Sequence, residues 1–516
     1  MPIIILKKEC KRDYSSPELF FSNRSEKLQI DPKHHKSIKN NVVARHRKMA
    51  SKTSTTLRET ASNCCKQVYI GAAILPRPLF VPDFDDDGEV DGAGDGDVVL
   101  RRPRIKCATI ATVTAEEERL SHSTVTRYAQ VLSSEFNSVV IEHHLKWSPL
   151  VIHPYLDAAE TPRHHLGTYD FHHVDLMVDW ATENGMHIKG HALIWHVTSP
   201  VSILEKMTPS QVRSAVRRHI FTTIAYFKDR ISMWDVVNEA LAGDGSLVEN
   251  VFYRKMGPNY IEECFRWAHE ADPDAFLIYN DNKVEGCGCG DVDDGVQLQS
   301  QKCKAKSPNQ SKADGFYNLL KDLVQKKVPV HGAGMQAHFS AGGVKNQRAP
   351  TPSMVKRQIR RIGMLGLKVN ISEMDVRIST LKSASDTVRE IAQMDIYYGT
   401  LTAALSEEAF HGIWFWGFTD RHTWVKNFYY EDTPLIFDEQ YKRKSCYLGV
   451  EAALLSLCPS RRVPPYEYLE VDVDHDGHEW GQNWMMPEPA EEERPAGENE
   501  TRDTTKEGLP DWMQPS

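Results

Sequence analysis

The sequence predicts an α/β protein built as a (β/α)8 TIM barrel with disordered N-terminal and C-terminal extensions. Two observations lead to this prediction. Between about 101 and 458, short apolar runs alternate with segments of helical periodicity, as repeated βα units do. The apolar runs also tend to end in polar or aromatic residues. Because the carboxyl ends of all strands of such a barrel meet at one rim, this second pattern indicates an active face there.

Eight apolar runs are the predicted strands. They span 106–113, 136–142, 187–196, 231–239, 275–281, 330–338, 367–376 and 411–420. The segments between them include amphipathic helices. Within 171–185, apolar residues recur at i, i+3, i+4 and i+7 from Val174, and Gly185 can end the helix. The segment 314–327 has the same period.

The regions outside the barrel have a different composition. We expect 1–100 to be a polar, largely disordered extension, 101–460 to be the barrel domain, and 461–516 to be an acidic, Pro-rich disordered tail. Half-matches to a calcium loop begin at Asp83 and Asp472, and both lack the closing glutamate. We interpret them as solvated loops.

Composition excludes several classes of function. The chain has 516 residues, of which 41% are apolar. Its net charge is −9, so the sequence offers no excess of positive charge for binding nucleic acid. No stretch approaches the roughly 20 apolar residues that span a bilayer, so we expect no membrane partner. Three cysteines (Cys287, Cys289 and Cys303) gather in one Gly/Asp-rich stretch without a fourth zinc ligand. We expect no metal site and no cofactor.

Two glutamates, Glu239 and Glu373, end the fourth and seventh predicted strands. Strand alternation puts Asp235 and Glu239 on one side of their strand and Asn238 on the other. Each glutamate alone could be a rim residue in a salt bridge. Together they would face each other across the barrel mouth, as the paired carboxylates of glycoside hydrolysis do, one protonated and one ionised. Their separation, which would distinguish retention from inversion, cannot be obtained from sequence.

Other strand ends supply groups suited to a sugar. Flat indoles offer apolar faces to pyranose rings, and Trp147, Trp195, Trp416 and Trp424 follow proposed strands. We assign Trp234 and Trp414 to the core instead. Hydrogen bonds to hydroxyls would come from Lys146, His191, Asn238, Gln336 and His338.

Five ordered blocks resemble the glycoside hydrolase family 10 endo-1,4-β-xylanases over about 107–455. They are GHALIWH (190–196), WDVVNEA (234–240), GMQAH (334–338), NISEMDV (370–376) and WGFTDRHTW (416–424). The resemblance implies a retaining enzyme on a (β/α)8 barrel that cleaves internal bonds of xylan, acts as a monomer and uses no cofactor.

The resemblance also implies roles. Glu239 would be the general acid/base and Glu373 the nucleophile, with Asn238 and His191 on the −1 sugar and His338 keeping the nucleophile ionised. The further matched positions line the sugar-binding subsites; they are Glu142, Lys146, Trp195, Gln336, Trp416 and Trp424.

The chain departs from the family pattern in places. His143 and His144 stand where the family commonly has Asn after Glu142, Thr198 replaces a glutamine, and Asn282 replaces an aromatic residue. These changes affect substrate contacts and leave the catalytic groups in place. The insertion 284–312 lengthens the loop after the fifth strand.

Two other functions remain open. One is a non-hydrolytic xylan-binding protein on the same barrel; the other is a related barrel glycosidase or transglycosylase acting on another β-glycan. Relatives of this family usually act outside the cell, and we expect the same here. No signal peptide is visible, since the first apolar run, Ile3–Leu6, has only four residues before charged residues follow.

Overall fold

The computed structural model describes residues 55–63, 67–81, 125–152, 168–286, 308–342, 349–382, 384–429 and 431–456. All of them belong to one compact unit, Ser54–Ser516. Several predictions fall outside these residues and are not tested: the strand over 106–113, both acidic half-loops, the clustered cysteines, the tail 461–516, and most of the predicted extension 1–100.

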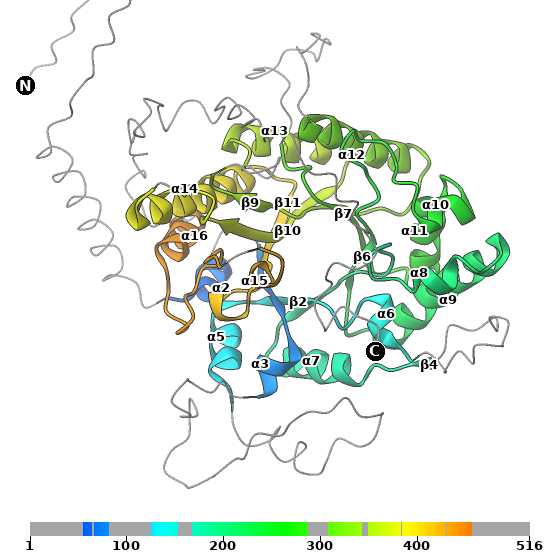
Figure 1. The fold of residues 1–516 in the computed structure, drawn as a ribbon, viewed down its shortest axis with the longest axis horizontal. Helices are drawn as coiled ribbons and strands as arrows, with labels where there is room; N and C mark the ends of the chain where they lie inside the picture. The colour runs from blue at the N-terminus through cyan, green and yellow to red at the C-terminus, as the bar shows by residue number, and fades with distance from the viewer. Residues whose placement is uncertain are drawn as a thin grey trace, which may run out of the picture. The chain divides into compact units, whose positions relative to one another are not determined.

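Within the described ranges, eight parallel strands close into a barrel (Figure 1). In order they are β1 (Tyr69–Ile74), β2 (Ser138–Ile141), β5 (His187–Gly190), β6 (Met233–Asn238), β7 (Phe276–Asp281), β8 (Gly332–Met335), β10 (Lys368–Arg377) and β11 (Phe410–Phe415). Each pairs with its neighbours, and β11 closes the ring by pairing with both β10 and β1. The short β9 (His338–Ser340) pairs with the end of β10, and β3 (Val151–Ile152) pairs with β4 (Thr168–Tyr169) apart from the barrel. The predicted (β/α)8 fold is confirmed.

Helices surround the barrel (Figure 1). Those before β7 are α2 (Leu57–Ser62), α3 (Pro76–Phe80), α5 (Arg127–Glu135), α6 (Trp147–Leu150), α7 (His172–Glu183), α8 (Val201–Leu204), α9 (Pro209–Phe227), α10 (Val251–Met256) and α11 (Tyr260–Ala271). Those after it are α12 (Pro308–Gln325), α13 (Pro352–Gly363), α14 (Asp386–Leu405), α15 (Val425–Phe428) and α16 (Ser445–Leu455). No helix in the described part of the chain has the length and apolar character needed to cross a bilayer.

The predicted helical periodicity holds in α7 and α12. In α7 the four residues at the predicted spacing, from Val174 to Ala181, are the buried ones. The start of α9 shows why helices begin where they do: Thr208 and Gln211 form a capping box that satisfies free backbone N–H groups, and Pro209 follows the cap.

Two tryptophans are buried on opposite faces of the barrel wall: Trp414 lies inside the barrel, and Trp234 faces the surrounding helices, near Phe227 of α9. Trp234 and Trp414 are fully buried, as predicted. Each lies against a glycine on a neighbouring strand, since a Cβ atom on Gly71 would lie 2.2 Å from the Trp414 ring and one on Gly190 would lie 2.2 Å from the Trp234 ring. On both faces of the barrel wall, a large side chain therefore lies beside a small one on the next strand, as dense packing requires.

The predicted domain boundary at 100/101 is wrong. The first barrel strand is β1, at 69–74, which pairs with β2 and β11. The helix α2 before it also belongs to the barrel domain, because the Leu57 backbone N–H donates to Glu135 of α5 at 2.9 Å. The strand was missed because its Gly and Ala residues give a weak apolar signal; the neighbouring ring of Trp414 requires that small size.

Candidate active site

The carboxyl ends of the barrel strands carry the polar groups that the sequence predicted. Because all eight strands are parallel, residues that follow different strands meet at one end of the barrel. Glu142 follows β2, His191 follows β5, Glu239 follows β6 and Gln336 follows β8. Glu373 lies inside β10, and Trp416 follows β11.

Glu239 is held at the end of β6 by hydrogen bonds from two directions. Trp195 Nε1 donates to Glu239 Oε2 at 3.0 Å, and Gln336 Nε2 donates to Glu239 Oε1 at 2.8 Å. The backbone of Glu239 has a φ of 54°, in the left-handed region. Its N–H donates to the Asn280 carbonyl oxygen of the next strand at 2.9 Å. Both donors to the carboxylate are neutral side chains.

The backbone after Glu239 is fixed by β7. Tyr279 Oη accepts from the Ala240 N–H at 3.2 Å, and Asp281 Oδ2 accepts from the Leu241 N–H, also at 3.2 Å. Lys312 of α12 pairs with the buried Asp281 at 2.7 Å. Burial raises the pKa of Asp281, and the ammonium of Lys312 opposes that rise. This support for the acid/base candidate was not predicted, although the polar residues that end β7 were a signal for it.

Asn282 has a partner that accounts for its departure from the family pattern. Its Oδ1 accepts from Lys312 Nζ at 2.8 Å. The amide therefore joins the same lysine that neutralises Asp281. An aromatic ring at this position would leave that ammonium with one acceptor fewer.

Glu373 lies in a different electrostatic environment. Asn280 Nδ2 donates to its Oε1 at 2.7 Å, and His338 Nε2 donates to its Oε2 at 3.2 Å. Burial alone would raise the pKa of Glu373, but His191, His338 and Lys189 outweigh burial and lower it to about 2. Glu373 is therefore a carboxylate at any ordinary pH.

His338 is an imidazolium between two carboxylates. Its Nδ1 donates to Asp375 Oδ2 at 2.8 Å while its Nε2 donates to Glu373. Burial would lower the pKa of His338, but the charges of Asp375 and Glu373 hold it well above its usual value. Trp424 Nε1 also donates to Asp375 Oδ2, at 2.8 Å. Asp375 and Trp424 thus fix the ring that faces the nucleophile candidate.

Two amides connect the glutamates. Asn238 Oδ1 accepts from Asn280 Nδ2 at 2.9 Å and from Gln336 Nε2 at 3.3 Å. Those same two amide groups also donate to Glu373 and to Glu239. The carboxylates therefore belong to one hydrogen-bonded network, which Asn280 completes. The sequence alone gave Asn280, within the predicted strand 275–281, no role in the site.

The predicted alternation in β6 is wrong at Asn238. The prediction put Asn238 and Glu239 on opposite sides, yet both accept from Gln336. A register shift between Asp235 and Val237 in the pairing of β6 with β7 adds one residue to the strand, and the left-handed φ of Glu239 turns the chain again. A bulge of this kind cannot be obtained from a period-two pattern.

A buried ionic group lies beneath Glu373. Asp235 accepts from Lys189 and, at 2.8 Å, from His191 Nδ1, and all three side chains are fully buried. His191 Nδ1 is also 4.0 Å from Glu373 Oε1. Asp235 and Lys189 are supporting residues that the sequence did not identify.

The remaining predicted residues line the same end of the barrel. Lys146 Nζ lies 4.8 Å from the ring centroid of Trp195 and 5.7 Å from that of Trp416, and the Trp416 ring lies 5.0 Å from His191. Burial raises the pKa of Glu142 to about 7, although Lys146 acts to lower it. Every residue to which the family resemblance gave a role is therefore in this one region.

Two further residues of the sequence analysis have different surroundings. Trp147 is buried and stacks on His219 with ring centroids 4.3 Å apart, so it belongs to the core and cannot present a face to a sugar. Burial lowers the pKa of His143 to about 3 and that of His144 to about 4, so both are neutral. Within the described ranges, no group of three or more His, Cys, Asp or Glu side chains is arranged to hold a metal ion.

A (β/α)8 barrel with two glutamates from its fourth and seventh strands, joined in one hydrogen-bonded network, defines the molecule as a glycoside hydrolase. Comparison with known proteins identifies the group within that class. Residues 104–294 and 290–453 match the model of glycosyl hydrolase family 10. The chain belongs to this family.

Its relatives are xylanases from bacteria and fungi. The chain is 31% identical to endo-1,4-beta-xylanase B of Thermotoga neapolitana over 365 residues, which cover 70% of this chain and 93% of that protein. It is 30% identical to a beta-1,4-xylanase of Dictyoglomus thermophilum, covering 64% of this chain and 85% of the relative. A crystal structure of xylanase 10B from Thermotoga petrophila in complex with xylobiose matches with a TM-score of 0.57 and 30% identity, covering 78% of this chain and 98% of that one.

Proposed function

We propose that the protein is an endo-1,4-β-xylanase that hydrolyses internal xylosidic bonds of xylan with retention of configuration. One observation carries this: Glu239 and Glu373 belong to one hydrogen-bonded network at the barrel rim, and the pKa of Glu373 is lowered to about 2 despite its burial, chiefly by His191 and His338. Hydrolysis with retention needs a division between a nucleophile and a proton donor. The xylanase names of its relatives, and the xylobiose bound to one of them, support the choice of substrate.

In the first step, a Glu373 oxygen attacks the anomeric carbon and forms a glycosyl ester. The bond from that carbon to the leaving oxygen breaks, and Glu239 gives its proton to this oxygen. In the second step, Glu239, now a carboxylate, takes a proton from water. The water oxygen attacks the anomeric carbon, the ester bond breaks, and Glu373 leaves as a carboxylate.

The surrounding residues hold this arrangement. His338 keeps Glu373 ionised and aligned, and Asn238, supported by Asn280, offers its amide to a hydroxyl of the sugar at the reaction centre. Trp195, Gln336, Trp416 and Trp424 orient the carboxylates and the sugar, with Glu142, Lys146 and His191 as polar partners. Glu142 has a pKa of about 7, so near neutral pH it can act as either hydrogen-bond donor or acceptor.

Replacing each carboxylate tests the proposal. Glu239→Gln and Glu373→Gln should each lower the release of reducing sugar from xylan by about 10³-fold or more, since each removes a group that acts in the transition state. The exposed Glu183 at the end of α7 supplies the matched control, because Glu183→Gln should retain full activity.

Azide distinguishes the two roles. With an aryl xylobioside, Glu239→Ala should be rescued by azide to give the β-glycosyl azide, because azide attacks the glycosyl ester without base catalysis. Glu373→Ala should give the α-glycosyl azide, because azide takes the place of the nucleophile. Reversed products would exchange the assigned roles. A folded wild-type protein that binds xylo-oligosaccharides and releases no products would be a binding protein instead.

We also propose that the protein acts outside the cell, as a monomer. Polymeric xylan as substrate supports the first point. Fractionation of the producing cells with mass spectrometry of the N-terminus tests location, and light scattering tests the oligomeric state.

A further inference from the structure

Two exposed aromatic side chains lie beside the proposed site. Phe428, at the end of α15, is 41% exposed, and Tyr429, the next residue, is 39% exposed. Both belong to the segment that follows β11. Exposed aromatic residues at the edge of a binding site are well suited to contact a ligand, because covering their apolar rings with the ligand removes those rings from water, which is favourable.

Trp424 connects this pair to the site. The ring centroid of Trp424 lies 5.0 Å from that of His338, 5.3 Å from that of Phe428 and 5.9 Å from that of Tyr429. The indole N–H is bonded to Asp375. We call Trp424, Phe428 and Tyr429 the aromatic shelf; it begins at the histidine that contacts the nucleophile and extends away to solvent.

The Tyr429 ring is fixed from one side. The guanidinium carbon of Arg377 lies 3.9 Å from the ring centroid, within cation–π distance. Arg377 is only 6% exposed and ends β10, the strand that carries Glu373. One face of Tyr429 is therefore held by the strand of the nucleophile, while 39% of the residue stays accessible.

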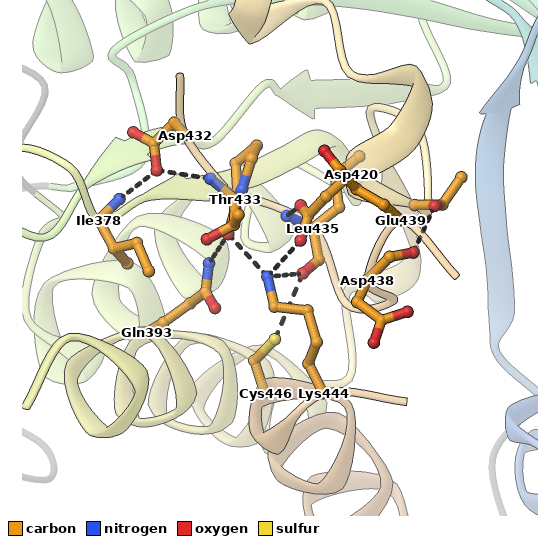
Figure 2. Close-up of polar contacts among 12 residues, drawn as sticks. Ile378, Gln393, Asp420, Asp432, Thr433, Leu435, Asp438, Glu439, Lys444 and Cys446 are labelled. Atoms are coloured by element: carbon orange, nitrogen blue, oxygen red, sulfur yellow. Dashed lines mark hydrogen bonds and ion pairs between the residues drawn. The ribbon is translucent and has the colours of Figure 1, made fainter. Parts of the chain in front are cut away.

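The segment that carries the shelf is tied down at both ends (Figure 2). At its start, Asp420 Oδ1 accepts from the Leu435 N–H at 2.8 Å, and Asp420 Oδ2 pairs with Lys444 at 2.7 Å. The Lys444 ammonium also donates to the carbonyl oxygens of Thr433 and Leu435.

At its other end, Asp432 accepts from the backbone N–H of Ile378, just beyond β10, at 3.0 Å. Figure 2 shows these contacts converging on the stretch from Asp432 to Leu435. The shelf is thus anchored before a ligand arrives, which lowers the entropy that binding would cost.

We propose that Phe428 and Tyr429, the outer part of the aromatic shelf, form an additional sugar-binding site. A long xylan chain whose reacting bond lies at Glu239 and Glu373 would stack a further xylosyl residue there. This inference rests on the proposed xylanase function. Apolar faces of pyranose rings stack on aromatic rings, and a polysaccharide held at the carboxylates continues beyond the reacting sugars. The contact of Trp424 with His338 and Asp375 places the inner end of the shelf next to those sugars, so long substrates reach Phe428 and Tyr429 and short ones do not.

The test compares a long with a short substrate. For the double variant Phe428→Ala/Tyr429→Ala, the ratio of kcat/KM on xylohexaose to kcat/KM on an aryl xylobioside should fall about tenfold, chiefly through KM on xylohexaose. Tyr429→Phe keeps the ring and should keep the ratio. Met364→Ala, which removes a 74% exposed side chain near the amino end of β10, is the surface control and should also keep it.

Two results would overturn the proposal: an unchanged kcat/KM ratio in the double variant, or an equal loss of kcat/KM on both substrates. Binding of xylohexaose to Glu373→Gln, measured by calorimetry with and without the two alanines, gives the answer without turnover. If the wild type cleaves neither substrate, the proposed function fails, while a weakened affinity in that calorimetric pair still supports the shelf.

Discussion

At the scale of single residues, the site depends on the different surroundings of the two glutamates. Glu239 follows β6 and Glu373 lies inside β10, and of the two only Glu373 accepts a hydrogen bond from a histidine. Burial works against its charge, and His191, His338 and Lys189 more than compensate, which brings its pKa to about 2. His338 can do this because Asp375 holds its proton. The carboxylate, the imidazolium and the second carboxylate act as one unit.

His338→Gln tests this unit. The glutamine can still donate a hydrogen bond to Glu373 but carries no charge, so the pKa of Glu373 should rise from about 2 toward its ordinary 4.5. The acidic limb of the kcat/KM profile on an aryl xylobioside should move to higher pH. His172→Gln, at an exposed position of α7, should leave it in place. An unmoved acidic limb in His338→Gln would mean that the charge of His338 does not set the ionisation of Glu373.

The same shift has a consequence for stability. The folded pKa of Glu373 lies below its unfolded value, so its ionisation stabilises the fold above about pH 4.5, and this stabilisation is lost as pH falls toward 2. In His338→Gln this stabilisation should be smaller and its loss should be complete at a higher pH, which acid titration followed by circular dichroism can measure.

At the scale of elements, the segments between strands and helices position the side chains. The bulge in β6 brings Asn238 and Glu239 to the same amide of Gln336. The segment after β11 carries the aromatic shelf and is fixed by the buried pair of Asp420 and Lys444. Burial raises the pKa of Asp420 to about 6 even with Lys444 beside it, so the pair costs desolvation and serves to fix a conformation.

Lys444→Met should destabilise the protein in a pH-dependent way. The folded pKa of Asp420, about 6, is above its ordinary 3.8, so the fold loses stability as pH rises between these values. Without the ammonium the pKa rises further. The loss in free energy of unfolding should therefore be about 3 kcal/mol at pH 8 and smaller at pH 5. Urea unfolding at both pH values measures it.

The partner substitution is the control for Lys444→Met. Asp420→Asn/Lys444→Met removes the buried charge together with its counterion and should recover part of the stability at pH 8. An equal loss at pH 5 and pH 8 would show that Lys444 acts through its carbonyl contacts alone.

At the scale of the whole molecule, the barrel closes through a strand that lies before the expected domain. β1 joins β2 and β11, and Gly71 makes room for Trp414, whose Nε1 donates to Ser138 Oγ of β2 at 3.0 Å. Removing β1 would open a sheet edge on each side and uncover the tryptophan in the barrel.

Two fragments test this closure. The fragment 101–460 has the originally predicted boundary and lacks β1, so it should be insoluble or unfolded. The fragment 54–460 retains every described strand and helix and should unfold cooperatively and cleave xylan. Circular dichroism melts and activity assays distinguish them. A folded, active 101–460 fragment would mean that another segment can take the place of β1.

Much of the site could be predicted because its groups stand at strand ends. The runs ending in Glu239, Gln336 and Glu373 are apolar with a polar terminus, which indicates a barrel rim wherever the strands are parallel. Trp234 and Trp414 were separable from Trp416 and Trp424 because the first two lie inside apolar strands. The position of Trp147 was harder to predict. Whether its indole packs on His219 or faces a sugar depends on α9, a helix that is distant in sequence.

The sequence by itself determined the fold class, the rim and the two carboxylates, because period and strand termini are local properties that repeat along the chain. Only the tertiary structure decided that β1 closes the barrel, that a bulge turns Asn238 toward Glu239, and that His338 and its neighbours ionise Glu373. The physical reason is that steric fit and electrostatic energy depend on distances between side chains from different strands. Those distances exist only once the strands have paired.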